Sequence, residues 1–228
     1  MPIQIWPADP SGPWWMAAQS ADPWQDLVGV GLSLDSALLL RAYRAGLFPM
    51  GLGRDGGSPM GWWSPDPRGV LLPGMLKVSR SLRKSMRAFE FTVDVAFDDV
   101  LAACADPARQ GRWITPQVAE AYRRLHREGW AHSVEVWRDG TLVGGLYGVA
   151  IGGLFAGESM FHRTRDASKA AFVILAGQVF ADGAPGRLID TQWRTDHLAT
   201  LGVVAIRRAD YLRRLPSALA AGPIWAPK

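Results

Sequence analysis

Residues 133–161, SVEVWRDGTLVGGLYGVAIGGLFAGESMF, are the part of the chain from which the fold can be read. This stretch is largely apolar and is interrupted by turn-forming pairs. Asp139-Gly140 is a strong signal for a two-residue hairpin, because both residue types tolerate a positive φ. Gly152-Gly153 indicates a second turn. The sequence therefore predicts three antiparallel strands in series.

Helices and strands are predicted on both sides of this meander. Before it, residues 91–95 (FTVDV) alternate like a strand, and FDDVLAACA reads as a helix. A second helix opens with Thr115 and Pro116 and ends at Gly129. The elements predicted after the meander are a helix that starts at Asp166 or Ser168 and runs to Phe180, a strand over RLIDTQW, a short helix over 195–201, and a final strand and helix.

The N-terminal part of the chain has a different composition. Residues 1–32 carry proline, glycine and tryptophan without a sustained period, so irregular structure is expected. Ser33 is a candidate N-cap of a helix that Gly46 ends. Residues 48–67 (FPMGLGRDGGSPMGWWSPDP) are expected to form a long loop, and residues 69–72 a short strand.

The order of these elements predicts the fold class. Strands and helices that flank a meander favour a mixed sheet in an α/β or α+β layer fold, an order compatible with acyltransferases of the GNAT type. We place a domain boundary near residue 78. The chain is thus expected to contain a small N-terminal domain (1–78) and a larger GNAT-like domain (79–228).

Composition narrows the functional classes. The single cysteine, Cys104, excludes an internal disulfide, and four scattered histidines leave no cluster at metal-ligand spacing, so no metal is expected. The N-terminus lacks the pattern of a signal peptide, and no window approaches the roughly 20 apolar residues of a membrane span. A cytoplasmic protein with no membrane partner is expected, and its net charge of +4 favours a polyanionic partner.

A cluster of cations is predicted on one helix. The spacing of residues 79–87 places four of them on a common face: Arg80, Arg83, Lys84 and Arg87. This face is either simply solvated or a phosphate-binding stripe, because like charges this close repel unless anions compensate them.

Two nucleotide-binding sites are excluded by their sequence context. GLGRDG at residues 51–56 matches GxGxxG, but proline-containing segments flank it where a dinucleotide site needs a strand and a helix. A CoA site of this general fold needs a glycine-bearing turn at a helix N-terminus. The sequence after the third strand, HRTRDASKAA, has no glycine between Gly157 and Gly177, so a CoA pocket is expected to be absent.

Three polar residues near strand ends are candidate catalytic groups. Asp190 and Gln192 stand two apart in LIDTQ, so a regular strand would project them to one face. Glu158 lies beside Gly157, where a ligand can approach closely. Each could instead be an ordinary strand-end group. Together they form a constellation without a Ser, Cys or His nucleophile, which suits direct attack by an amine on an activated ester.

Seven motif groups in the same order resemble the leucyl/phenylalanyl-tRNA-protein transferases, from about residue 27 to about residue 215. They are WWSPDPR (62–68), WIT (113–115), AYRRLH with GWAHSVEVW (121–137), LVGGLYGV (142–149), GESMF (157–161), ASK (167–169), and LIDTQ (188–192) with DHLATLG (196–202).

This resemblance implies an enzyme that transfers leucine or phenylalanine from aminoacyl-tRNA to acceptor proteins beginning with lysine or arginine, which marks them for N-end-rule degradation. It implies roles for the three polar residues: Asp190 and Gln192 would assist deprotonation of the acceptor amine, and Glu158 would lie near that amine. The residues it implies for substrate binding are Trp63 and Trp113 for the 3′-terminal adenosine, and Leu146, Phe155, Ile189 and Leu175 for the apolar side-chain pocket.

The chemistry fits the residues. An aminoacyl ester is already activated, so no covalent intermediate is required. No cofactor is expected, and the protein is expected to be a monomer. A neutral amide is a poor base, which favours Asp190 orienting Gln192 while water or the tRNA ribose hydroxyl moves the proton. Limited discrimination by apolar pockets predicts some methionine transfer. The alternatives are a CoA-dependent GNAT acetyltransferase and a noncatalytic RNA-binding module.

Overall fold

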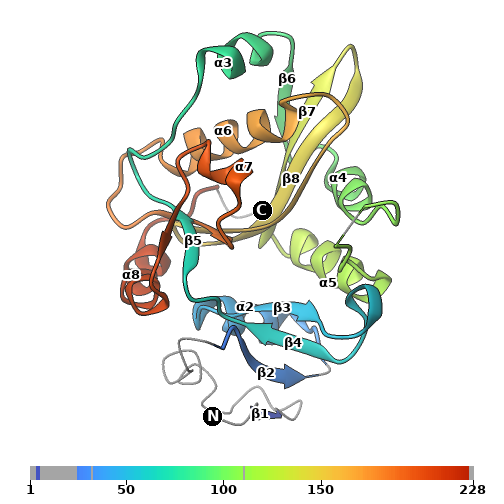
Figure 1. The fold of residues 1–228 in the computed structure, drawn as a ribbon, viewed down its shortest axis with the longest axis vertical. Coiled ribbons are helices and arrows are strands. Elements are labelled where there is room, and N and C mark those ends of the chain that lie inside the picture. The colour runs from blue at the N-terminus through green and yellow to red at the C-terminus, as the bar shows by residue number, and fades with distance from the viewer. Residues whose placement is uncertain (1–3, 6–24, 32, 110, 226–228) are drawn as a thin grey trace.

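The computed structural model describes residues 4–5, 25–31, 33–109 and 111–225, and arranges them as two sheets with helices packed on them (Figure 1). The smaller sheet has the strand order β1-β2-β4-β3. Its strands are β1 (Gln4–Ile5), β2 (Leu27–Gly31), β3 (Phe48–Gly51) and β4 (Met60–Trp63). Helix α2 (Ser36–Arg44) contacts β3, and a short 3-10 turn, η1 (Arg54–Gly56), lies between β3 and β4.

The larger sheet is mixed and has the order β11-β5-β10-β9-β8-β7-β6 among the described residues. Its strands are β5 (Arg68–Leu71), β6 (Glu90–Val93), β7 (Ala131–Arg138), β8 (Thr141–Ile151), β9 (Leu154–His162), β10 (Leu188–Gln192) and β11 (Val204–Ile206). β9 and β10 run parallel, while the other neighbouring pairs are antiparallel. The predicted fold class, a mixed sheet with helices, is confirmed.

Helices cover both faces of the larger sheet. They are α3 (Arg80–Met86), α4 (Phe97–Cys104), α5 (Pro116–Arg127), α6 (Ala167–Val179), α7 (Asp196–Ala199) and α8 (Arg208–Ala220). On β8, Leu146 belongs to the buried cluster formed with α6, whereas its neighbour Tyr147 belongs to the cluster formed with α4 and α5. This alternation, with period two, places α6 on one face and α4 and α5 on the other (Figure 1).

The predicted meander is confirmed as β7, β8 and β9. Asp139 and Gly140 have φ values of 50° and 69°, which is the left-handed pair that a two-residue hairpin requires. The predicted caps of α5 are also present. The Thr115 side chain accepts a hydrogen bond from the Val118 amide, and Gly129 follows the helix with a φ of 79°.

The long loop predicted over residues 48–67 is wrong. It contains β3 and β4, which pair from Phe48–Trp63 to Gly51–Met60. Each strand is only four residues long, too short for an alternating pattern to be visible beside so many glycines and prolines. The glycines are needed in the connection, since a Cβ atom on Gly56 would lie 2.4 Å from the Cα of Trp113.

Two further expectations near the N-terminus need correction. Residues 27–31, expected to be irregular, form β2, and most of residues 1–24 lie outside the described part of the chain. The N-cap of α2 is Asp35 rather than Ser33. An Asp35 oxygen accepts a hydrogen bond from the Leu38 amide at 2.8 Å, while the Ser33 hydroxyl donates to Asp35. Both residue types can cap, and the carboxylate lies closer to the first helical turn.

The division near residue 78 remains a prediction. β5 precedes residue 78 in sequence, and it pairs within the larger sheet between β10 and β11. Among the described residues, no helix combines the length and apolarity needed to cross a membrane.

Candidate functional site

A cavity opens where β9 and β10 part. Their parallel pairing runs from Leu188–Leu154 to Asp190–Ala156. Just beyond this point each strand carries a register shift, which leaves Glu158 as an extra residue of β9 against β8 and Thr191 as an extra residue of β10 against β5. β-Bulges of this kind redirect side chains. Here they redirect the side chains that follow Gly157 and Asp190.

The cavity has a volume of about 260 Å³ and is mostly apolar. Its apolar walls include Leu146, Phe155, Phe172, Leu175, Ile189 and Leu198. The four residues that the sequence predicted for an apolar pocket are thus all among its lining residues. Its polar lining includes Glu158, Thr191, Gln192 and His197. A cavity with apolar walls and a few polar groups suits an apolar group attached to a reactive centre.

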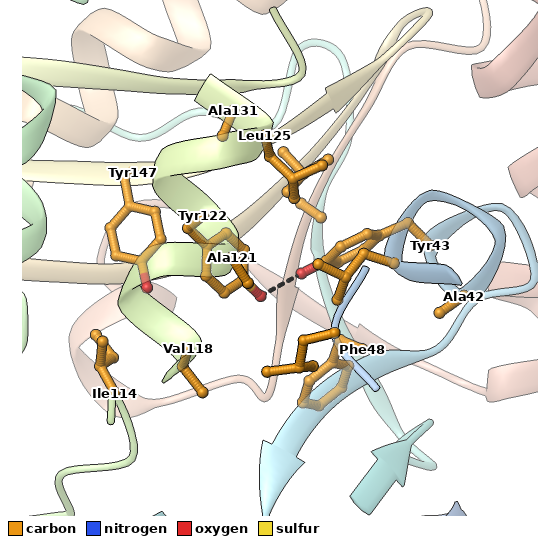
Figure 2. Close-up of a cluster of buried hydrophobic side chains, with 14 of the residues drawn as sticks. Ala42, Tyr43, Phe48, Ile114, Val118, Ala121, Tyr122, Leu125, Ala131 and Tyr147 are labelled. Atoms are coloured by element: carbon orange, nitrogen blue, oxygen red, sulfur yellow. Dashed lines mark hydrogen bonds between the residues drawn. The ribbon is translucent and has the colours of Figure 1, made fainter. Parts of the chain in front are cut away.

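Glu158 lies at the centre of a buried hydrogen-bond chain. The Gln192 side-chain amide donates to one carboxylate oxygen at 3.2 Å, and the Tyr122 hydroxyl donates to the other at 2.7 Å. The Tyr43 hydroxyl lies 2.6 Å from that of Tyr122. Figure 2 shows these two hydroxyls pointing toward one another across the gap between α5 and α2. The chain therefore connects the cavity to the small N-terminal sheet and its helix.

Burial raises the pKa of the Glu158 carboxyl from 4.5 to about 7, and the negative charge of Asp190 acts in the same direction. The hydrogen bond from Tyr122 opposes this shift. Burial also raises the pKa values of Tyr122 and Tyr43 well above normal, so both hydroxyls stay protonated. Glu158 is thus a carboxyl group that changes its charge near neutral pH.

Asp190 is held behind the cavity. One of its oxygens accepts a hydrogen bond from Arg68 Nε at 2.8 Å and another from the backbone N–H of Gln192 at 2.9 Å. The other accepts from Arg68 Nη2 at 2.6 Å and from the Tyr211 hydroxyl at 2.9 Å. Arg68 and Asp190 are each 1% exposed. These four hydrogen bonds occupy the lone-pair sites of the carboxylate, so it is arranged to fix Gln192 rather than to touch a ligand.

The expectation that Asp190 and Gln192 share a strand face is wrong. The extra residue, Thr191, interrupts the alternation, and Gln192 has a φ of 57°. Gln192 consequently lines the cavity, whereas Asp190 does not. Such a left-handed conformation is uncommon for glutamine, and the hydrogen bond that its backbone N–H donates to the Asp190 carboxylate stabilises it.

The two tryptophans predicted to hold an adenosine are not lining residues of the cavity. Trp63 donates to the Met50 carbonyl at 2.9 Å, and its ring lies 6.4 Å from that of Trp193. Trp113 packs edge-on against Tyr122, with 6.3 Å between ring centroids. Both tryptophans are partly buried against the cluster that includes Tyr122. Trp113 therefore touches the hydrogen-bond chain that ends at Glu158.

The predicted basic stripe forms on α3. Ser79 caps this helix, and four exposed cations lie on it or at its end: Arg80, Arg83, Lys84 and Arg87. Within the described residues, none of them takes part in an ion pair. α3 contacts α6, whose residues Phe172 and Leu175 line the cavity, so the stripe is connected to the cavity through one layer of packing.

Two polar atoms in the cavity lining were not predicted. The Oγ1 of Thr191 and the Nε2 of His197 are buried without a hydrogen-bond partner in the described part of the chain. Burial lowers the pKa of His197, and Lys169 and His162 lower it further, so the imidazole is neutral at neutral pH. Unpaired buried polar atoms cost about 1–3 kcal/mol each, which favours a ligand that pairs with them. The described residues contain no group of three or more His, Cys, Asp or Glu placed to hold a metal.

Comparison with known proteins identifies the family. The chain matches the model of the leucyl/phenylalanyl-tRNA protein transferase over residues 70–216, and the model of that transferase's N-terminal domain over residues 33–66. Among solved structures, a ribosomal-protein-alanine N-acetyltransferase from Brucella melitensis biovar Abortus 2308 aligns with a TM-score of 0.31 and 23% identity, covering 44% of this chain and 74% of that one.

Relatives agree with the family models. The leucyl/phenylalanyl-tRNA–protein transferase of Chromohalobacter salexigens is 53% identical over 206 residues, covering 87% of this chain and 78% of that protein. The same transferase of Solidesulfovibrio magneticus is 51% identical over 197 residues, covering 84% and 78%. These names describe aminoacyl-tRNA-dependent aminoacyltransferases. The chain belongs to the leucyl/phenylalanyl-tRNA protein transferase family.

Proposed function

We propose that the protein transfers leucine or phenylalanine, and some methionine, from aminoacyl-tRNA to the N-terminal Lys or Arg of acceptor proteins in the cytoplasm. The product would carry an N-terminal signal for degradation. The observation that supports this most is the apolar cavity of about 260 Å³, which has Glu158 and Gln192 in its lining.

The cavity walls suit the aminoacyl side chain. Leu146, Phe155 and Ile189 present hydrocarbon from β8, β9 and β10, while Phe172 and Leu175 do so from α6. Burial of an apolar side chain contributes about 1.5–3 kcal/mol. Such walls reject charged and strongly polar side chains, but they separate apolar ones by only about 10–200-fold per methylene, which is why methionine transfer is included.

Transfer requires one bond to form and one to break. The acceptor α-amine attacks the ester carbonyl carbon, so a C–N bond forms and the bond from that carbon to the ribose oxygen of tRNA breaks. The proton lost by the nitrogen passes to ionised Glu158, which returns it to the departing ribose oxygen. Gln192 orients the carboxylate through its 3.2 Å hydrogen bond. Asp190 positions Gln192 and stays outside the reaction.

We assign the proton to Glu158 on physical grounds. A general base is most effective when its pKa lies near the working pH. Burial provides this for Glu158, with a pKa of about 7. The amide of Gln192 accepts protons very poorly. This assignment replaces the water or ribose hydroxyl that the sequence favoured.

The acceptor backbone is proposed to lie against Thr191 and His197. A leucine or phenylalanine side chain offers no hydrogen-bonding group, so the unpaired Oγ1 and Nε2 atoms need another partner. The peptide group next to the attacking amine supplies both an N–H and a carbonyl. A neutral imidazole can pair with either of them.

The tRNA is proposed to bind outside the cavity. Trp63 and Trp113 would hold the 3′-terminal adenosine by stacking, which is worth about 1–3 kcal/mol per base. The four cations of α3 would contact phosphates and so provide affinity without reading sequence.

A transfer assay tests the function. The protein is incubated separately with leucyl-, phenylalanyl- and methionyl-tRNA and a peptide that begins with arginine, and mass spectrometry measures the added residue. An otherwise identical peptide beginning with alanine, and the arginine peptide with an acetylated N-terminus, are the controls. We expect addition only to the free arginine peptide. Absence of addition from any charged tRNA, or acetylation of the peptide when acetyl-CoA is supplied instead, would overturn the proposal.

A further inference from the structure

The C-terminal segment returns to the sheet behind the cavity. After α8 ends, residues 221–225 lead back toward α6, and Ile224 and Trp225 pack against a buried cluster. That cluster contains Leu146, Leu175 and Ile189, which are lining residues of the cavity. Trp225 itself is not a lining residue. The segment therefore contacts the cavity walls from outside.

The indole of Trp225 contacts two elements that supply walls of the cavity, β9 and α6. The ring of Trp225 meets the ring of Phe155 edge-on, with 5.8 Å between centroids and an interplanar angle of 75°. Its Nε1 donates a hydrogen bond to the Oε1 of Gln178. Phe155 belongs to β9, whereas Gln178 belongs to α6, the helix that supplies Phe172 and Leu175 to the cavity. A movement of Trp225 would consequently change both walls.

The indole is held on a third side. It lies against the imidazole of His132, with 4.5 Å between centroids and an interplanar angle of 34°. His132 is fixed in turn by Asp94, at 2.7 Å from Nδ1 to the carboxylate, and its Nε2 lies 3.2 Å from the Gly129 carbonyl. Because interiors are close-packed, a ring held by three elements acts as a rigid stop for Phe155, which is 0% exposed.

We propose that Trp225 is a positioning residue that limits the size of the aminoacyl cavity by holding Phe155 in place, and so sets the preference between leucine and phenylalanine. This inference rests on the proposed function of the cavity. Removal of the indole leaves space on the outer side of Phe155, into which that ring can relax. The cavity then widens, and the larger aminoacyl group gains more from the change than the smaller one.

The test compares kcat/KM for phenylalanyl-tRNA and leucyl-tRNA in matched variants. We expect Trp225→Ala to raise the ratio of the phenylalanine to the leucine value by about 5-fold, less than the roughly 10–200-fold by which a directly contacting apolar pocket separates side chains one methylene apart. Trp225→Phe retains a ring against Phe155 and His132, so its ratio should return most of the way to wild type. Gln178→Ala removes the hydrogen bond alone and should give an intermediate ratio.

Trp137→Ala is the control. Trp137 is also partly buried, and its Nε1 donates to a side-chain oxygen, that of Thr92 at 2.8 Å, but it packs against the other buried cluster. A general loss of folded protein lowers both transfer rates equally and leaves the ratio unchanged, as we expect for this control. The same result for Trp225→Ala, with the folded fraction checked by circular dichroism, would overturn the inference.

Phe155→Ala separates this inference from the function on which it rests. Phe155 lines the cavity directly, so its truncation should change the ratio if the cavity binds the aminoacyl side chain. A change with Phe155→Ala but none with Trp225→Ala would reject only the role of Trp225. No change in the ratio with either variant would reject the proposed use of the cavity as well.

Discussion

The side-chain amide of Gln192 donates a hydrogen bond to Glu158 across 3.2 Å, although the two residues come from different strands that have already stopped pairing. Each residue lies at or next to a strand irregularity, with Glu158 itself the extra residue in β9 and Gln192 directly after the extra residue in β10. The contact therefore depends on two local departures from regular strand geometry. It brings a carboxyl group with a raised pKa and its hydrogen-bond donor to the wall of one apolar cavity.

The first prediction concerns the pH dependence of transfer. If ionised Glu158 accepts the proton, kcat/KM should rise with pH through the carboxyl pKa of about 7. The acceptor amine also titrates, at about 7.7–8, and adds a second rise. Glu158→Gln should lower kcat/KM by about 10²–10⁴-fold and remove the rise near 7 while the amine step remains. A profile in the variant with the same two steps as wild type would show that the lower step belongs to another group.

The second prediction concerns stability. The folded state raises the pKa of Glu158 from 4.5 to about 7, so the folded protein holds this proton more tightly than the unfolded chain does. The stability contributed by the neutral carboxyl is fully present below pH 4.5 and is lost as the pH rises through about 7. A shift of this size corresponds to roughly 3 kcal/mol. Urea titration measures how much the free energy of unfolding falls between pH 5 and pH 8. In Glu158→Gln this fall should be smaller than in wild type, because the contribution of the Glu158 carboxyl is removed. An unchanged fall would contradict the shift.

Regular patterns allowed much of the fold to be predicted from the sequence. The meander was predictable because Asp139 and Gly140 fit a two-residue turn, and because its strands are long. The strands β3 and β4 were not, because each is four residues long and is surrounded by glycine and proline that also occur in loops. Their pairing depends on contacts such as the burial of Trp62, which no local pattern displays.

The site was predictable in its residue types but not in its geometry. Glu158 and Gln192 could be named from motifs, and Leu146, Phe155, Leu175 and Ile189 do line one cavity.

The displacement of Asp190 from the cavity follows from the bulge at Thr191, which sequence periodicity does not reveal. Arg68 was overlooked, although a charged residue that begins an apolar strand indicates a buried partner.

The third prediction concerns the buried pair of Arg68 and Asp190. Removal of one partner leaves the other charge buried and unpaired, which costs about 3–5 kcal/mol. Asp190→Ala should therefore reduce the free energy of unfolding by this amount, and part of its loss of transfer would be loss of folded protein. Asp98, which pairs with Arg123 at the surface, offers a control, because Asp98→Ala should cost no more than about 1 kcal/mol. Equal, small losses in the two variants would mean that Asp190 is not the structural support described above.

The fourth prediction concerns His197. If its Nε2 pairs with the acceptor backbone, His197→Phe should raise KM for the acceptor peptide about 10-fold, the cost of one lost hydrogen bond with a buried partner left unpaired. KM for aminoacyl-tRNA should change little, because the aminoacyl side chain contacts the apolar walls. Steady-state kinetics with each substrate varied in turn separates the two values. A rise confined to aminoacyl-tRNA would move His197 to the other substrate.

The fifth prediction concerns the basic stripe on α3. Arg83 and Lys84 are exposed and, within the described residues, form no ion pair, so their replacement should not disturb the fold. If both contact phosphates, the double alanine variant should bind tRNA more weakly and reduce the slope of log K against log salt by about 1.4–1.8, since each lost contact contributes about 0.7–0.9. Arg214→Ala, which removes one exposed cation from α8, is expected to leave the slope within error of the wild-type value. A slope in the double variant equal to that of wild type would mean that the α3 cations are only solvated, and that the tRNA backbone is neutralised elsewhere on the protein.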